Sequence, residues 1–156
     1  MDLRERIAAA TKEAMKSRDA ARLSTLRLIG AGIKDREIAA RGEPGNEGAD
    51  GLREEDLVAL LSKMVKQRQE SARAFEEGGR IELAEREQAE ITVIQEFLPR
   101  QLDDAEVAAA VDRVIADLGA SSVRDMGRVM GELRARHAGQ MDFGAVGALV
   151  KSRLMG

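Results

Sequence analysis

Large apolar side chains recur every three or four residues along most of this chain, and only two prolines, Pro44 and Pro99, interrupt the pattern. This spacing places apolar groups on one face of an α-helix, and no segment shows the alternation and β-branched enrichment typical of a strand. The sequence therefore predicts an all-α protein. We expect helices over residues 2 to 17, 19 to 41, 54 to 77, 80 to 98, 103 to 118, 123 to 136 and 142 to 154. A single bent helix is the alternative for the first two.

A segment rich in glycine and acidic residues separates the first helices from a long hairpin. Residues 42 to 53 carry no large apolar side chain before Leu52, and their composition predicts a flexible acidic loop. Residues 54 to 98 then predict an antiparallel helical hairpin. The glycine pair at positions 78 and 79 ends its first helix, because glycine readily takes the left-handed conformation that closes a helix.

Pro99 divides the 156-residue chain into two predicted domains. The residue before a proline is disfavoured in helical geometry, so the hairpin ends there. Three shorter helices follow, each with its own apolar face, and they predict a small bundle. We therefore expect an N-terminal helical domain over residues 1 to 98 and a C-terminal three-helix domain over residues 99 to 156.

The composition excludes most kinds of catalytic and metal-binding site. The chain has no cysteine and a single histidine, which excludes thiolate nucleophiles, disulfides, zinc fingers and iron-sulfur sites. His137 lies in a loop-like stretch, and no Gly-x-Ser-x-Gly motif is present to supply a nucleophile. The sequence therefore predicts a non-enzyme with no catalytic residues, no metal and no cofactor.

The N-terminus mixes charged and apolar residues, and no apolar stretch approaches the roughly 18 residues that a membrane-spanning helix needs. Neither a signal peptide nor a membrane segment is expected. Together with the absence of cysteine, these features favour a cytoplasmic protein.

Basic residues are concentrated in part of the predicted C-terminal domain. Residues 124 to 153 hold six basic and three acidic groups, a local excess of +3 in a chain whose net charge is −3. Arginine suits bidentate contacts with phosphate, and a chain with three Phe and neither Tyr nor Trp offers few rings for stacking bases. This pattern predicts RNA binding through phosphates, with a solubilising face as the alternative. The candidate residues are Arg124, Arg128, Arg136, Lys151 and Arg153.

The predicted hairpin carries basic and acidic residues in alternation. Such a pattern is typical of a solvated helix face with weak ion pairs. The alternative is a partner surface whose charges select the orientation of another protein. Its candidate residues are Lys66, Arg68, Arg73 and Arg80.

Several short blocks resemble the YqeY family, also called GatB/YqeY-like proteins, along nearly the whole chain. The blocks occur in the family's order and are spread over both predicted domains. They are MKSRD at 15 to 19, RLSTLR at 22 to 27, VKQR at 65 to 68, LPRQL at 98 to 102, GASS at 119 to 122 and DMGRVM at 125 to 130.

The resemblance implies an all-helical protein whose last three helices are similar to the tail domain of the B subunit of the tRNA-dependent amidotransferase. In that enzyme the tail is understood to engage tRNA, whereas the catalytic cradle lies in a different domain that residues 1 to 99 do not resemble. The implied function is therefore non-catalytic binding of tRNA or of an amidotransferase component. A protein-interaction adaptor that uses the hairpin and binds no RNA is the alternative.

The turn before the last helix departs from the family pattern. The family tends to place a Lys or Arg after the glycine of this turn, whereas this chain has Gln140 after Gly139. If the turn holds RNA, we expect weaker RNA binding than the family pattern implies.

Overall fold

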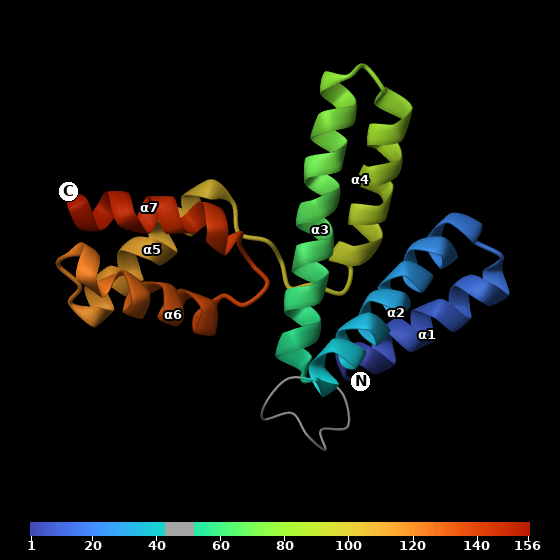
Figure 1. The fold of residues 1–156 in the computed structure, drawn as a ribbon, viewed down its shortest axis with the longest axis horizontal. Helices are drawn as coiled ribbons and strands as arrows, with labels where there is room; N and C mark the ends of the chain where they lie inside the picture. The colour runs from blue at the N-terminus through green and yellow to red at the C-terminus, as the bar shows by residue number, and fades with distance from the viewer. Residues whose placement is uncertain (43–51) are drawn as a thin grey trace. The chain divides into compact units, whose positions relative to one another are not determined.

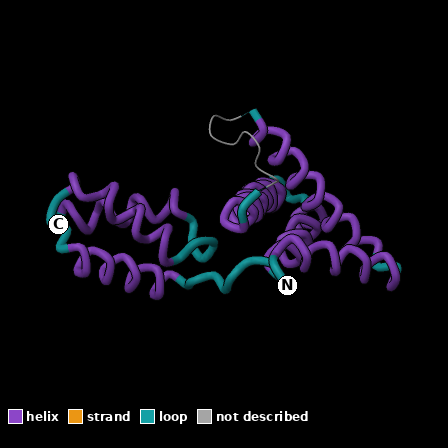
Figure 2. The backbone as a smooth tube through the Cα atoms, turned by 90° about the horizontal axis from the view of Figure 1, so that it is seen from below, coloured by secondary structure: helices purple, strands orange, loops and turns teal. Residues whose placement is uncertain are grey.

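The computed structural model describes residues 1–42 and 52–156, and it confirms the predicted all-α class. The described residues form seven α-helices and one short 3-10 helix, with no strand among them (Figures 1 and 2). The elements are α1 (Leu3–Ser17), α2 (Ala20–Arg41), α3 (Glu54–Glu77), α4 (Ile81–Gln95), α5 (Asp104–Leu118), η1 (Val123–Asp125), α6 (Met126–Arg136) and α7 (Phe143–Met155). In the described part of the chain, no helix is both long and apolar enough to cross a membrane.

Aspartates begin four of these helices. The side chain of Asp2, Asp19, Asp103 or Asp142 accepts a hydrogen bond from a backbone N–H in the first turn of the helix that follows. Such a cap satisfies one of the N–H groups that a helix leaves without a partner at its start. The cap at Asp19 also separates α1 from α2, so the first two helices are distinct rather than one bent helix.

Two glycines adopt the left-handed conformation at helix ends. Gly119 follows α5 with φ 62°, and Gly79 follows α3 with φ 76°. A side chain is disfavoured in this conformation, which explains the glycine at both positions. Arg18 ends α1 with φ 56° and is the non-glycine residue with positive φ in the described part of the chain.

Two local differences from the expected helices stand out. α4 ends at Gln95, three residues before the predicted end, and the backbone of Glu96, Phe97 and Leu98 continues with i to i−3 hydrogen bonds. Pro99 disfavours helical geometry at Leu98, so the α-helix does not extend to the predicted end. The sixth predicted helix begins as the 3-10 turn η1, which Asp125 closes by accepting from the N–H groups of Ser121 and Ser122.

The predicted loop over residues 42 to 53 lies mostly outside the described residues, which resume at Leu52. At its edges, Gly42 caps the end of α2, and the half-buried Leu52 packs against the N-terminal core. Helices α3 and α4 lie side by side and are joined by residues 78–80, as an antiparallel hairpin (Figure 1).

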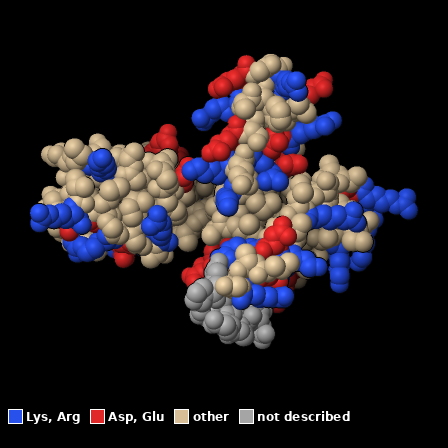
Figure 3. All heavy atoms as spheres, in the orientation of Figure 1, with Lys and Arg blue, Asp and Glu red and all other residues tan. Residues whose placement is uncertain are grey.

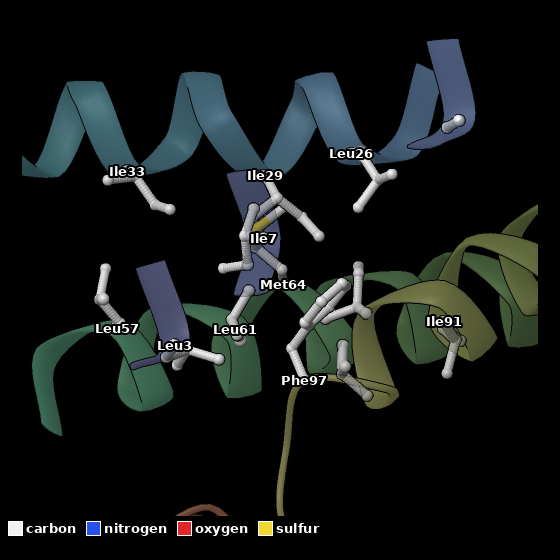
Figure 4. Packing of buried hydrophobic residues seen from close by; sticks show 13 residues of the cluster. Leu3, Ile7, Leu26, Ile29, Ile33, Leu57, Leu61, Met64, Ile91 and Phe97 are labelled. Atoms are coloured by element: carbon white, nitrogen blue, oxygen red, sulfur yellow. The ribbon is translucent and has the colours of Figure 1, made fainter. Parts of the chain in front are cut away.

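The chain divides into two compact units, Met1–Leu98 and Pro99–Gly156. In the first unit, α2 presents Leu26, Ile29 and Ile33 to the hairpin, and α3 presents Leu57, Leu61 and Met64 (Figure 4). Leu3 and Ile7 of α1 and Phe97 at the end of the hairpin complete this core. All of these side chains are buried, so four helices share one apolar centre.

Polar contacts fasten α1 to the hairpin over long sequence separations. The backbone N–H of Leu3 donates to Oε1 of Glu54 at 3.1 Å, and Arg6 donates to the carbonyl of Glu96 at 3.0 Å. The Arg6 guanidinium also lies 5.7 Å from the centre of the Phe97 ring. The first helix therefore depends on residues at the far end of its unit for its packing.

The second unit has a core of its own. Val111 and Val114 of α5, Val129 and Leu133 of α6 and Val150 of α7 are almost completely buried. The backbone N–H of Leu102 donates to the carbonyl of Gln140 at 2.9 Å, which ties the start of this unit to the turn before α7.

Candidate functional site

The five candidate RNA-binding side chains of the second unit are all exposed. Arg124 lies in η1, Arg128 and Arg136 lie in α6, and Lys151 and Arg153 lie in α7. Basic side chains are spread over the visible face of this unit, at the left of Figure 3, with neutral surface between them. Three separate elements thus contribute cations.

Three of these five cations, Arg128, Arg136 and Arg153, form ion pairs with carboxylates. Arg136 contacts Asp117 and Glu132, each at 2.8 Å, and Arg153 contacts Asp112 at 2.9 Å. The hydrogen bonds that Arg136 donates to Asp117 and then to Glu132 raise its pKa above the usual value. Because Asp112 and Asp117 lie on α5, a charge count over residues 124 to 153 does not include them.

Arg128 has a local structural role. Its guanidinium lies 3.0 Å from Oδ1 of Asp125 and 3.5 Å from the carbonyl of Leu118. The Ser121 N–H, followed by Arg128 and the Ser122 N–H, lowers the pKa of Asp125. Arg128 therefore braces the carboxylate that closes η1, and its replacement would affect the turn as well as the surface charge.

Arg124 and Lys151 remain as cations without an ion pair or hydrogen bond among the described residues, and both are exposed. Two further arginines of this unit lie outside the candidate set: Arg134, which is one of the six basic groups counted over residues 124 to 153, and Arg113, which precedes that range. Arg113 on α5 is exposed, and Arg134 lies with its guanidinium 5.7 Å from the centre of the Phe143 ring. The helical position of Arg113 opposite buried Val111 and Val114 could have identified it.

In the turn before α7, Gln140 stands at the position where the resemblance led us to expect a Lys or Arg. The Gln140 side chain donates to the carbonyl of Arg100 at 3.1 Å and lies 3.2 Å from Nδ1 of His137. Its carbonyl accepts from Leu102, and Gly139 has φ 74°. In place of the expected cation, this chain has an amide that joins two segments of the unit.

One of the four hairpin candidates is held by contacts within the hairpin, and the other three are exposed. Arg68 donates through Nε to Oε2 of Glu90 at 2.9 Å and through a terminal nitrogen to the carbonyl of Met64, and only 16% of its side chain is exposed. It therefore connects α3 to α4. Lys66, Arg73 and Arg80 are exposed, and Arg80 lies at the start of α4.

A groove of about 500 Å³ lies between α2 and α3. Leu28 and Gly32 line it from α2, and Leu60 and Lys63 line it from α3. A Cβ on Gly32 would lie 3.6 Å from Sδ of Met64, so the absence of a side chain there adds to the space between the helices.

The described residues contain no cluster of three or more His, Asp or Glu side chains that would form a metal site, and none of their hydrogen bonds pairs a hydroxyl with His137. The hydroxyls of Thr11, Thr25 and Thr92 donate to carbonyls of their own helices. The hydrogen-bond partner of His137 is Gln140 rather than a hydroxyl.

A family model described as Yqey-like protein matches residues 4–154. The chain belongs to the YqeY family. The match covers both units, so the resemblance seen in the short sequence blocks is confirmed. This family description states no catalytic activity.

Fungal YqeY-family relatives share the name altered inheritance of mitochondria protein 41, mitochondrial. The relative from Lachancea thermotolerans is 34% identical over 113 residues, which is 71% of this chain and 57% of that protein. The relative from Eremothecium gossypii is 33% identical over 109 residues, 69% of this chain and 56% of that protein. For Saccharomyces cerevisiae the identity is 27% over 128 residues, 78% of this chain and 65% of that protein.

The chain thus spans less than two thirds of the length of these YqeY-family relatives. Their names also contradict the expected cytoplasmic location, because the relatives are mitochondrial by name. The prediction of a cytoplasmic location is therefore wrong, because it was based on cysteine content and hydropathy. Cysteine content and hydropathy determine how a helical domain folds and packs, and these features do not identify the compartment in which a YqeY protein works.

Proposed function

We propose that this protein is a non-catalytic binding protein whose second unit contacts tRNA, or a tRNA-linked partner, through phosphate groups. The observation that carries the proposal is the pair of exposed, uncommitted cations, Arg124 in η1 and Lys151 in α7. The choice of tRNA rests on the expectation, implied by the YqeY resemblance in the sequence analysis, that this unit is similar to the amidotransferase tail. The absence of an assembled nucleophile and base among the described residues supports a binding role.

The geometry also limits how strong such binding can be. Each phosphate neutralised contributes about −0.9 to the slope of log K against log salt. Two uncommitted cations therefore predict a slope of about −2. Arg136, Arg153 and Arg128 could add to this only by giving up carboxylates that lie 2.8 to 3.0 Å away. Binding should accordingly be weak at moderate salt and measurable at low salt.

The test is a fluorescence anisotropy titration of labelled bulk tRNA with the full chain at low ionic strength. We expect the double variant Arg124→Glu and Lys151→Glu to lose binding, while its circular dichroism stays that of the wild type because both side chains are exposed. The matched control is Arg73→Glu and Arg80→Glu, which makes the same charge change on exposed residues of the first unit. This control should keep most of the binding.

Two results would reject tRNA binding by the second unit. One is the absence of wild-type binding at low salt, and the other is an equal loss in both double variants, since general charge would then account for it. Arg128 is left unchanged in this design, because its contact with Asp125 would combine a structural effect with the electrostatic one.

A further inference from the structure

The outward face of α2 has a regular pattern that the proposed function does not use. Seven of its residues follow one another at alternating spacings of four and three, and every one of them is exposed. We call this set the α2 seam. It consists of Ala20, Ser24, Arg27, Ala31, Lys34, Ile38 and Arg41.

The opposite face of α2 explains why this pattern is outward. Leu26, Ile29 and Ile33 point into the core of the first unit (Figure 4). A helix with one apolar face usually carries mixed charges on the other. The α2 seam has three cations and no carboxylate, and the exposed carboxylate of α2, Asp35, lies beside it at the groove.

The three cations of the seam, Arg27, Lys34 and Arg41, have no charged or hydrogen-bonding partner among residues 1–42 and 52–156. This differs from the second unit, where three of the five candidate cations have carboxylate partners. Basic side chains gather over α1 and α2 in Figure 3, and residues 1–42 hold ten basic against six acidic groups.

The spacing of the cations matches the repeat of a partner helix. Seven residues at about 1.5 Å each separate successive cations by about 10.5 Å along α2. A second helix packed along the seam would place every seventh residue at the same interval. Between the cations, Ser24 and Ala31 are small enough to let another backbone approach closely.

Exposed apolar side chains beside the cations place a second requirement on any partner. Ile38 in the seam is 58% exposed, and Leu28, which lines the adjacent groove between α2 and α3, is 43% exposed. A partner that matches this surface has apolar side chains for Ile38 and for the groove as well as negative charge for the cations. The groove, at about 500 Å³, has room for side chains of such a partner.

We propose that the α2 seam binds an acidic amphipathic helix of another protein. In this complex, carboxylates spaced by seven residues lie opposite Arg27, Lys34 and Arg41, and apolar side chains of the same helix cover Ile38 and enter the groove beside Leu28. The charges fix the register and orientation of the partner, and the apolar contacts supply much of the affinity.

An acidic helix fits this surface better than RNA does. Phosphates would satisfy the cations but would leave Ile38 and Leu28 in contact with water. α2 has no aromatic side chain on which a base could stack. This surface lies in the first unit and so is separate from the phosphate contacts proposed for the second unit.

The experiment uses the full chain and a labelled synthetic helical peptide with Glu at the first position and Leu at the fourth position of each heptad. We expect binding at low salt, with at least a tenfold loss in the double variant Arg27→Glu and Lys34→Glu. A peptide with Lys in place of each Glu should bind that variant and not the wild type, which tests charge matching directly. Ile38→Ser should weaken binding of the acidic peptide without altering the thermal melt.

The matched control is Lys12→Glu and Lys16→Glu, an equal charge change on exposed residues of α1. Equal loss in this control, or no binding of the acidic peptide to the wild type, would overturn the proposal. Displacement of the peptide by poly(U), with poly(U) binding lost in the α2 variant, would assign the seam to RNA. A wild-type dimer in sedimentation that the α2 variant dissociates would assign it to a second copy of the chain.

Discussion

Replacement of Leu133 by alanine is expected to destabilise the second unit while leaving the first unit intact. Leu133 is 0% exposed and lies among Val111, Val129 and Val150 in the second core. No residue of this core belongs to the cluster that fills the first unit. The two cores therefore predict two separate responses to one cavity.

The size of the effect follows from the burial of the side chain. A buried Leu→Ala change costs about 3 to 4 kcal/mol in a typical core, from lost transfer free energy and the cavity left behind. At about 0.1 kcal/mol per residue, a unit of this length has a free energy of unfolding of about 6 kcal/mol. The variant should therefore keep a folded second unit with about a third to a half of its free energy of unfolding.

Native-state hydrogen exchange followed by mass spectrometry measures both units in one sample. Amides of α5, α6 and α7 that exchange by unfolding of their unit should exchange roughly 100 to 1,000 times faster in Leu133→Ala, since each 1.4 kcal/mol changes an equilibrium about tenfold. Amides of α1 to α4 should be unchanged. Leu61→Ala, at a residue of the first core that is also 0% exposed, should give the opposite pattern.

Equal acceleration in both units by either variant would refute independent stability. The chain would then unfold as one cooperative body, and Pro99 would not mark an energetic boundary.

Two further predictions concern single residues. Arg18→Gly should raise the free energy of unfolding by about 0.5 to 1 kcal/mol, because the left-handed conformation of Arg18 suits glycine. Gly119→Ala should lower the free energy of unfolding by about 1 kcal/mol for the same reason. Denaturant titration measures both, and a destabilised Arg18→Gly variant would show that the Arg18 side chain stabilises the turn. Hydrogen bonds from Arg100, followed by the Asp103 N–H, lower the pKa of Glu106 to about 2. Because this folded-state pKa is depressed, the charge of Glu106 contributes stability above its ordinary pKa, and the contribution is lost as pH falls toward 2. Glu106→Gln keeps an acceptor for the Asp103 N–H, so the stability difference between wild type and variant should shrink between pH 5 and pH 2; a constant difference would rule out the ion pair as its cause.

Helix positions followed closely from local sequence signals. Asp19, Asp103 and Asp142 act as the caps that their positions before apolar runs suggest, and Gly79 and Gly119 have the positive φ that their place at helix ends requires. The end of α4 was placed three residues too late. Ile94, Phe97 and Leu98 continue the apolar spacing, and a periodic pattern does not distinguish the last helical turn from an apolar turn that packs on the same core.

The candidate sites were harder to predict, because they depend on which helices become neighbours. Arg68 and Glu90 are 22 positions apart and become partners only when the hairpin closes. Asp112 and Arg153 are 41 positions apart and meet across α5 and α7. A count of charges along the chain treats such residues as independent. The exposed spacing of the α2 seam was present in the sequence, but its significance depends on knowing that the other face of α2 is buried.

The contacts of α1 also determine how early this helix can pack while the chain is being synthesised. Arg6 and Phe97 lie at opposite ends of the first unit, and their contact cannot form until the ribosome has made nearly the whole unit. At about 5 to 20 residues per second, the apolar stripe of α1 waits several seconds for its partners. The delay is shorter in the second unit, because its core residues lie closer together along the chain, from Val111 to Leu154. Helix α1 is therefore the part of the first unit that most needs protection from aggregation while the nascent chain grows.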